Sequence, residues 1–481
     1  MTALSSPPSA LRSEPAGHPR RWAILALVLL VECMDLLDGT IVNVAAPSIR
    51  ADLGSGLSSL QWIAGGYALT FAVGLVTGGR LGDVYGRRRL FLGGVGGFAA
   101  ASMLCGLAPT SAALVAARLL QGACAALMIP QGFGIIRAAF APDEVGRAFA
   151  AFGPVIGLSA VLGPVLGGVL TEGDVLGLGW RSIFLVNLPL AAAALVAGAR
   201  LLPESRAAAP PTLDVPGAAL ITAAAGLLVY PLIQGREAGW PAWAFASMAA
   251  ALAVLAAFAV AERRRERVGL SPLVTPSLFR RRAFTAGLLC ALVFFAGMIG
   301  LMLVFSLYLQ MGLGYGAAHA GVAFVPWSLG TAVGAGLGAG LLGPRFGRVT
   351  LHAGAAVMLT GVLGMLAVVH ATGPDMSVWH IAGPELLAGA GMGMLLAPLF
   401  DFVLAGVEDH EVGSASGVLN ATQQLAGAVG IAAIGTVFFS VAGDAGIRRA
   451  FEAALWIDAA LLVVTAALVL LLPRRAREGV H

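Results

Sequence analysis

Three carboxyl residues, Glu32, Asp35 and Asp38, lie in a long apolar run that starts at Trp22. A charge at the centre of a bilayer costs roughly 2.5–3.5 kcal/mol on insertion scales, so such residues usually face a cavity or a partner. At about 100° per residue, Asp35 and Asp38 share one helix face, and Glu32 lies one turn below Asp35. The pattern predicts a proton- or substrate-binding site. The alternative is that one of these acids only pairs with a base and stabilises the helix bundle.

Arg118 is a second charge inside an apolar run, at 111–136. A rise of 1.5 Å per residue puts it about 10 Å below the outer edge of the membrane, and puts Asp35 and Asp38 about 20 and 24 Å above the inner edge. In a hydrocarbon core of about 30 Å these depths coincide. We therefore expect Arg118 to face Asp35 or Asp38 across a central cavity. A static ion pair is the alternative interpretation.

The composition indicates a helical membrane protein. The 481 residues are 58% hydrophobic and only 11% charged, against about 25% charged in soluble domains. Fourteen apolar runs reach the roughly 17–25 residues that a spanning helix needs. The chain has no lysine, and most of its 29 basic residues fall in alternate loops. The positive-inside rule then places both termini in the cytoplasm. The runs are 22–47, 60–80, 89–108, 111–136, 147–170, 180–202, 214–234, 240–261, 283–310, 318–342, 349–371, 377–404, 412–440 and 450–472.

Two short matches at the same spacing suggest an internal repeat. An Arg-Arg pair opens the runs at 20–22 and 281–283, and a Gly-Arg pair follows the second run of each half, at 86–87 and 347–348. Two parallel six-helix halves with two helices inserted between them explain this spacing. The predicted division is a disordered tail (1–20), an N-terminal bundle (21–203), two inserted helices (204–262), an Arg-rich cytoplasmic connector (263–282), a C-terminal bundle (283–473) and a cytoplasmic tail (474–481).

The loop between the second and third runs combines glycines with charges. Glycine permits a tight turn and close helix approach. Asp83 lies near a helix C-terminus, where the dipole disfavours an anion, so we expect a cationic or helix-N-terminal partner, with the start of the helix near Val412 as one candidate. The arginines could instead be plain positive-inside anchors. The residues of interest in this loop are Gly79, Asp83, Gly86, Arg87 and Arg88.

The fifth run is rich in small residues, and their spacing lets two helices approach closely. Pro164 removes one backbone hydrogen bond and can bend this helix. Simple packing also explains many glycine-rich membrane helices. The residues of interest are Ser159, Gly163, Pro164, Gly167 and Gly168.

The second half offers fewer candidates. Glu385 and Asp458 lie about seven and eight residues into their runs, where they could reach the cavity or a shallow polar pocket near the outer face. Phe324 and Trp327 are candidate cavity residues, although aromatic side chains in such helices more often pack. No Cys/His cluster has metal-ligand spacing, and we expect no cofactor.

These segments resemble the signature motifs of the major facilitator superfamily, in its fourteen-span drug:proton antiporter branch. The helix-1 pattern is similar to residues 37–47, with Ala46 in place of Leu, and the loop 2–3 pattern to residues 79–88, with departures at Gly82, Val84 and Arg88. An Arg-x-x-Gln-Gly pattern fits Arg118, Gln121 and Gly122. The helix-5 antiporter pattern fits residues 159–168, with Ser159 at its first glycine.

The resemblance implies an all-α major facilitator fold and a multi-pass protein of the bacterial plasma membrane. It implies that Arg118 assists proton transfer, that Asp38 couples protons to transport, and that Asp83 with its arginines governs the inner gate. The function implied is antiport: export of a lipophilic drug or antibiotic in exchange for protons. The expected partners are that cargo, protons and membrane lipids, without nucleic acid, and we expect a monomer.

Other functions stay open at this point. A dedicated exporter of an endogenous natural product fits the same residues. A proton-coupled nutrient importer has the same fold, but the helix-5 glycine pattern argues against it. The sequence contains no nucleophile–base constellation and no nucleotide-binding Gly-Lys-Ser/Thr loop, so an enzyme or an ATP-driven pump is not expected.

Overall fold

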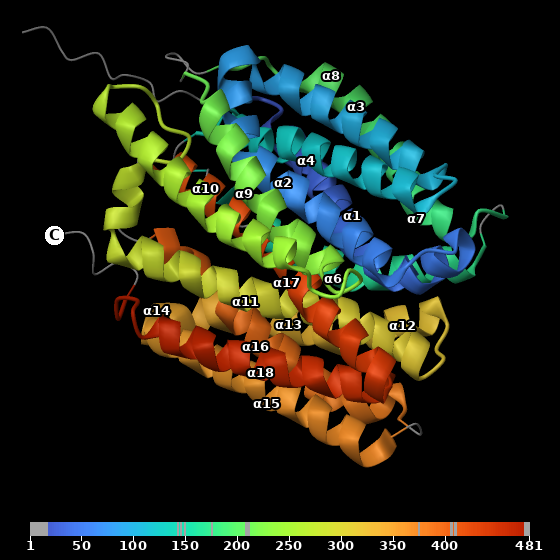
Figure 1. Ribbon diagram of the computed structural model, residues 1–481. Coiled ribbons are helices and arrows are strands. Elements are labelled where there is room, and N and C mark those ends of the chain that lie inside the picture. Colours follow the sequence, from blue (N-terminus) through green and yellow to red (C-terminus); the bar gives the residue numbers. More distant parts are fainter. Residues whose placement is uncertain are drawn as a thin grey trace, which may run out of the picture.

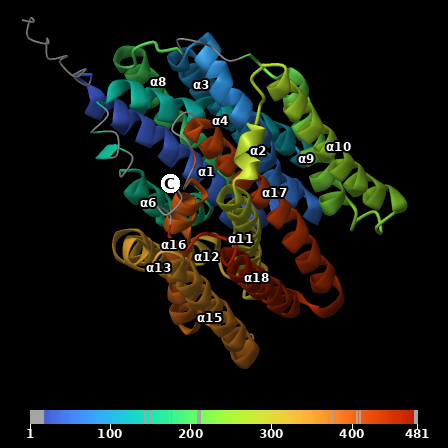
Figure 2. The ribbon, with the colours of Figure 1, turned by 90° about the vertical axis from the view of Figure 1, so that its left-hand side faces the viewer.

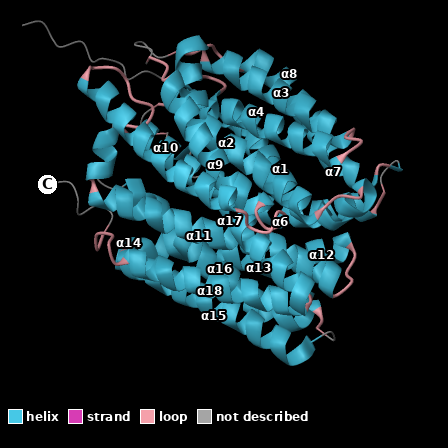
Figure 3. Cartoon of the chain, in the orientation of Figure 1, coloured by secondary structure: helices cyan, strands magenta, loops and turns pink. Residues whose placement is uncertain are grey.

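The structure is a computed structural model that describes residues 18–141, 144, 147–148, 151–174, 177–206, 212–373, 376–404, 407 and 411–475. All regular secondary structure in these residues is helical, and the long helices run roughly side by side (Figure 1, Figure 3). Most of the predicted N-terminal tail (1–20) and of the C-terminal tail (474–481) lies outside the described residues.

The N-terminal half consists of α1 (Arg21–Leu53), α2 (Leu57–Tyr85), α3 (Arg87–Gly106), α4 (Ser111–Ala139), α6 (Phe152–Glu172), η2 (Gly179–Arg181), α7 (Ser182–Leu185) and α8 (Asn187–Leu201). Local signals define several of the helix ends. Thr110 caps α4 by accepting a 3.2 Å hydrogen bond from the Ala113 amide. Gly54 ends α1 in the left-handed conformation (φ 59°), which glycine adopts without strain.

Two helices are inserted after this half: α9 (Val215–Gln234) and α10 (Ala242–Arg267). One face of α9 packs into the seam between α2 and a C-terminal helix, where Ala225, Val229 and Ile233 share a core cluster with Ala68 and Ala428. In contrast, α10 packs mainly on α9 and lies at the edge of the molecule in Figure 2. The inserted pair therefore lies outside the two six-helix halves, with one face of α9 in a small core cluster shared by both.

The C-terminal half begins with η3 (Pro276–Arg280) and α11 (Arg282–Leu307), which continues into the π-helical turn η4 (Tyr308–Gly312). Next come α12 (Ala317–Ala323), α13 (Val325–Leu337), η5 (Gly338–Leu342) and α14 (Gly343–Phe346), which together form one interrupted span. The last helices are α15 (Arg348–Thr372), α16 (Val378–Leu404), α17 (Val412–Ala445) and α18 (Ile447–Val469).

Within the described residues, 12 helical segments are long and apolar enough to cross a membrane. They coincide with twelve of the fourteen predicted apolar runs. The two other runs correspond to α1, with 33 residues, and α6, with 21 residues. Both pack against helices of the twelve, and α1 carries four carboxyls, Glu32, Asp35, Asp38 and Asp52. Twelve candidate spans are thus present, and the full count of fourteen stays a prediction.

The two halves meet along α2 with α17 and along α6 with α12. The polar contacts between them lie at the end of the bundle where α1 ends, which we call the outer end after the prediction from the arginines. Gln61 Nε2 donates to the carbonyls of Ile431 (3.1 Å) and Ala432 (2.9 Å). Ser306 Oγ donates to the Asn43 carbonyl at 2.9 Å, and Gln310 Nε2 donates to the Val44 carbonyl at 2.8 Å. Hydrogen bonds to backbone carbonyls therefore close the two halves together at this end.

At the opposite end, Arg80 of α2 contacts the connector between α10 and α11. Its guanidinium donates to the carbonyls of Ser271 (3.2 Å), Leu273 (3.1 Å) and Pro272. The connector itself is attached to the C-terminal half, because Ser277 and Arg281 both donate to Glu411 at the start of α17. Within the predicted connector (263–282), α10 extends to Arg267 and η3 occupies Pro276–Arg280.

Candidate functional site

The polar centre of the N-terminal half is the contact between Asp38 of α1 and Arg118 of α4. Their charged atoms form an ion pair, and both residues are only 1% exposed. The expected meeting of Arg118 with one of the helix-1 carboxyls is therefore present. It does not face an open cavity, however, because the pair is enclosed by helices of its own half.

Three further side chains surround this ion pair. Gln121 Nε2 and Asn187 Nδ2 both donate to Asp38 Oδ1, at 2.9 and 2.7 Å. Ser102 accepts from the same two amides and donates to the Phe184 carbonyl at 2.8 Å. These contacts bring α1, α3, α4 and α8 to one point. A buried carboxylate with this many donors is well compensated for the loss of water.

Arg118 is compensated in the same way. Its Nε donates to the Ile63 carbonyl at 3.0 Å, and its Nη1 also reaches Gln121 Oε1 at 2.8 Å. The guanidinium carbon lies 4.3 Å from the centre of the Tyr67 ring. A cation over an aromatic face gains electrostatic stabilisation, particularly in a desolvated site.

Tyr67 also connects this centre to the second helix-1 carboxyl. Its hydroxyl donates to Asp35 Oδ1, and Asp35 is 5% exposed. The same side chain therefore touches Arg118 with its ring and Asp35 with its hydroxyl. A change in the charge of Asp35 would reach Arg118 through one residue.

Glu32 lies one turn further along α1 and differs from the two aspartates. Its side chain is half-buried, and no hydrogen bond or ion pair to it is found within the described part of the chain. The three acids thus form a gradient along one helix, from the enclosed Asp38 through Asp35 to the more accessible Glu32.

The loop between α2 and α3 gives Asp83 a cationic partner from its own neighbourhood. Arg87 Nη2 donates to Asp83 Oδ1 at 2.8 Å, and Arg87 Nη1 donates to the Gly134 carbonyl of α4 at 3.3 Å. Gly86 adopts φ 109°, a value that favours glycine. The expected cationic partner is therefore Arg87, whereas a contact of Asp83 with the start of α17 is not among the interactions of the described residues.

The other predicted gate residues also contact the N-terminal half. The Arg88 backbone amide donates to Glu204 at 3.2 Å, and its guanidinium donates to the Ala199 carbonyl at 2.7 Å. A Cβ at Gly79 would lie 3.5 Å from Pro130 of α4, which is ordinary contact. This cluster ties the loop to α4 and to the end of α8, so any gate function requires the cluster to move as a unit with this half.

Close packing by small residues is found on two faces of α6. A Cβ at Gly163 would lie 1.9 Å from Thr40 Oγ1, and one at Gly167 would lie 2.8 Å from Ile41. On the other face, Gly168 and the Pro164 carbonyl contact α12, where a Cβ at Gly168 would lie 2.3 Å from the Ala317 carbonyl. Ser159 Oγ donates to Cys33 Sγ at 3.3 Å. The small residues therefore allow α6 to pack closely between α1 and α12 of the opposite half.

The four candidates of the second half are all buried in the C-terminal core. Glu385 is 0%, Asp458 1%, Trp327 3% and Phe324 4% exposed. Trp327 Nε1 contacts Met392 Sδ at 3.3 Å, and Phe324 packs edge-on against Phe305. These side chains face the interior of their own half in this conformation, and their place in a cavity stays a prediction.

Three members of the Asp38 network, Tyr67, Ser102 and Asn187, were not singled out from the sequence as site residues. A signal was present, since each is a hydrogen-bonding side chain within an otherwise apolar run. Such residues also occur as isolated packing groups. Only the fold shows that Asn187 bonds Asp38, that Ser102 accepts from the two amides that hold Asp38, and that Tyr67 bonds the neighbouring Asp35.

Comparison with known proteins places the chain in a family. The pattern of the Major Facilitator Superfamily matches residues 28–431. The chain is 50% identical over 451 residues to a probable actinorhodin transporter of Streptomyces coelicolor, an alignment that covers 92% of this chain and 78% of that protein. It is 37% identical over 422 residues to the puromycin resistance protein pur8 of Streptomyces alboniger, with 87% and 82% covered.

A solved structure supports the fold. The structure of an auto-inhibited peptide transporter of the POT family superposes with a TM-score of 0.68 at 15% identity, covering 94% of this chain and 96% of that one. At this identity the likeness concerns the fold alone. The expected all-α major facilitator fold is thereby confirmed.

Proposed function

Because the chain belongs to the major facilitator superfamily, and is thus a multi-pass membrane transporter and not an enzyme, we propose that it exports an antibiotic-like lipophilic compound from the cell in exchange for protons. Relatives named for puromycin resistance, for cephamycin export and for multidrug resistance support the cargo class. The observation that carries proton coupling is the chain of contacts Asp38–Arg118–Tyr67–Asp35.

The chain of contacts suggests how a proton could act. A proton that enters by way of Glu32 would reach Asp35, and its arrival would remove the negative charge that Tyr67 bonds. Tyr67 would then shift against Arg118, and the Asp38–Arg118 pair would rearrange. Since this pair holds α1, α3, α4 and α8 together, its rearrangement would alter the packing of the whole N-terminal half.

The same proposal includes alternating access. The halves are held together at the outer end by Gln61, Ser306 and Gln310. In the proposed cycle, cargo enters from the cytoplasmic side while these outer bonds are in place. Cargo release would require those bonds to break and the inner ends to approach, with the Asp83–Arg87 cluster at the inner gate.

We further propose fourteen spans with both termini in the cytoplasm. The twelve candidate segments together with α1 and α6 make up this number. The Arg-rich loops then fall on one side of the membrane, as the positive-inside rule requires. Because α9 and α10 add two spans between the halves, both halves begin on the same side of the membrane.

The test is expression in an antibiotic-sensitive bacterial host, with growth measured against puromycin and actinorhodin. Asp35→Asn leaves the Asp38–Arg118 pair intact and should abolish resistance while the protein still folds. Asp38→Asn should do the same, but it also leaves Arg118 buried and unpaired, at a cost of roughly 3–5 kcal/mol in stability. Asp444→Asn, at the exposed outer end of α17, is the matched control. Full resistance with both Asp35→Asn and Asp38→Asn would refute the coupling role of these acids.

A dedicated exporter of one natural product is the second candidate. The observation in its favour is the 50% identity to a probable actinorhodin transporter, well above the 37% to the puromycin resistance protein. A narrow exporter would protect against a single aromatic compound, whereas a multidrug exporter would protect against several unrelated ones. The same growth assay, run with both compounds, distinguishes the two.

A further inference from the structure

Glu385 of α16 is an ionisable residue that the proposed mechanism does not use. Its side chain is 0% exposed. Neither Oε1 nor Oε2 has a hydrogen-bond partner within the part of the chain that the structure describes. The contrast with Asp38 is strong, because Asp38 accepts bonds from Arg118, Gln121 and Asn187.

The position of Glu385 on α16 explains its isolation. One face of α16 packs on α15, where Gly361 leaves room for the Pro384 carbonyl and the Ala388 amide. Another face packs on α13, where Gly389 contacts the Trp327 carbonyl. At about 100° per residue, Glu385 lies between these two faces and shares its side of the helix with Met392. Glu385 is thus on the face of α16 that is turned to the core of the C-terminal half.

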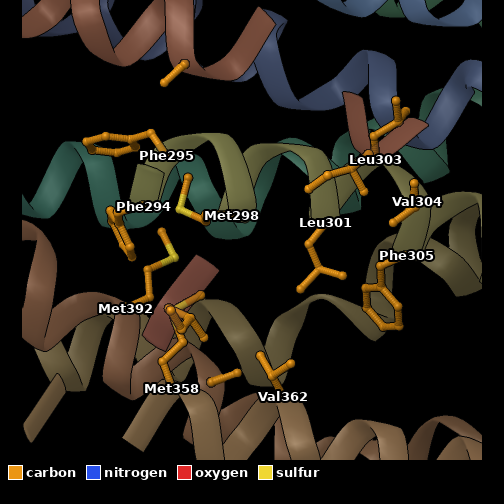
Figure 4. Packing of buried hydrophobic residues seen from close by; sticks show 14 of the residues in the cluster. Phe294, Phe295, Met298, Leu301, Leu303, Val304, Phe305, Met358, Val362 and Met392 are labelled. Carbon is orange, nitrogen blue, oxygen red and sulfur yellow. The ribbon is translucent and has the colours of Figure 1, made fainter. Parts of the chain in front are cut away.

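The surroundings of that face are apolar. Figure 4 shows Met392 directed toward Phe294, Met298 and Met358 in this core. The described part of α13 contains no titratable side chain, and neither does η5. The other helices that pack on α16 carry six titratable groups: Arg348, His352 and His370 of α15, Arg282 and Cys290 of α11, and Asp444 of α17. Besides Glu385, α16 itself carries His380 and Asp401.

None of these groups is placed to compensate a charge on Glu385. Gly361 marks the level of Glu385 on α15, and His352 and His370 are nine residues away in either direction, about 13 Å along the helix. His370 lies 3.7 Å from Glu452 and is largely exposed. Cys290 is directed to the Thr465 carbonyl of α18. An ionised carboxylate at position 385 would therefore be buried without a donor, which is strongly unfavourable.

We propose that Glu385 is a proton-binding residue of the C-terminal half, separate from the Asp38 network, and that it carries a proton in the conformation described here. Its discharge requires the core between α13, α15 and α16 to open, so the proton leaves only in another conformation. The second part of this proposal rests on the proposed proton-coupled export, whereas the first part does not.

Infrared spectroscopy of the full-length protein in lipid nanodiscs at neutral pH tests the first part. A protonated carboxyl has a C=O stretching band that ionised carboxylates lack. Glu385→Gln should remove one such band, and the variant should elute as the wild type does on size exclusion. Glu452→Gln is the matched control, since Glu452 is paired with Arg448 at 2.8 Å and should be ionised. An unchanged protonated-carboxyl band in Glu385→Gln would overturn the proposal.

Proton counting tests the second part. Vesicles with an imposed proton gradient are loaded with ethidium as a fluorescent probe, and the limiting accumulation of the dye gives the number of protons exchanged per dye. Glu385→Gln should lower this number by one relative to wild type and to Glu452→Gln. An unchanged number would exclude Glu385 from the cycle. If wild type itself fails to respond to the gradient, the proposed export function fails, and the infrared result still decides whether Glu385 binds a proton.

Discussion

Tyr67 is the residue whose two contacts can be separated by mutation. Tyr67→Phe keeps the ring over Arg118 and removes only the hydroxyl that bonds Asp35. A hydrogen bond to a charged group contributes roughly 1.5–3 kcal/mol net, so we expect a loss of stability of that size and a several-fold loss of proton-driven export. Tyr67→Leu also removes the cation–π contact and should lose about another 1–2 kcal/mol. Export from vesicles and thermal unfolding in detergent measure the two effects.

The contrary result for this residue is also informative. If Tyr67→Phe exports as well as wild type, the hydroxyl does not connect Asp35 to Arg118 in the working protein. Thr222→Val is a suitable control, because Thr222 bonds only the Ala218 carbonyl of its own helix and is exposed. It should leave both stability and export unchanged.

At the residue scale, the sequence was informative about charges and less so about neutral polar groups. The pairing of Arg118 with a helix-1 acid could be predicted because buried charges are rare and the depth of each can be counted along a helix. Asn187 could not be predicted as a partner of Asp38, nor Ser102 as a partner of Asn187, since nothing in a linear sequence shows which way a polar residue of one helix faces relative to another. The unpartnered state of Glu385 likewise depends on what lies around it.

At the scale of the helices, the contact of α6 with α1 depends on Gly163. A Cβ at position 163 would lie 1.9 Å from Thr40 Oγ1, so Gly163→Ala requires the Thr40 side chain or one of the two helices to shift. Overpacking of this kind typically costs roughly 1–3 kcal/mol, and we expect a loss of that size in thermal stability together with reduced export. Circular dichroism melts and the resistance assay provide the measurements.

Two further variants separate packing from other causes. Gly39→Ala lies in the same region of α1 with nothing within 4 Å of the added Cβ, so it should not destabilise the protein. Thr40→Ala removes the clashing oxygen, which bonds only the carbonyls of its own helix. It should therefore partly restore Gly163→Ala, and an absence of rescue would contradict the steric explanation.

Helix positions were predictable at this scale because apolar length is a strong signal. The predicted run at 214–234 coincides with α9 (Val215–Gln234), and the run at 377–404 with α16 (Val378–Leu404). Interruptions were not predicted. The sequence gives no periodic sign of the π-helical turns at Tyr308–Gly312 and Gly338–Leu342, which depend on packing against neighbouring helices.

At the scale of the whole molecule, Gln61 joins the two halves at the outer end. Gln61→Leu removes its bonds to the carbonyls of Ile431 and Ala432. We expect this change to favour the conformation in which the outer ends separate. Spin labels at Ala51→Cys and Asp444→Cys, both exposed at that end, would report a larger population of long distances by double electron–electron resonance. The native cysteines are replaced beforehand.

Thr422→Val serves as the comparison for Gln61→Leu. Thr422 is on α17 and bonds only the Val418 carbonyl of its own helix, so the distance distribution should stay that of the parent. If Gln61→Leu also leaves the distribution unchanged, hydrogen bonds at this seam do not set the balance between conformations.

The arrangement of α9 has a consequence for lipid exposure. This helix covers the seam along which α2 of one half and α17 of the other must slide, and α10 in turn shields α9. When α2 and α17 slide past each other, their surfaces at this seam therefore contact protein instead of lipid acyl chains. Lipid thickness and fluidity should accordingly affect the motion less at the α2–α17 seam than at the α6–α12 seam. Among the described helices, no inserted pair packs over the α6–α12 seam.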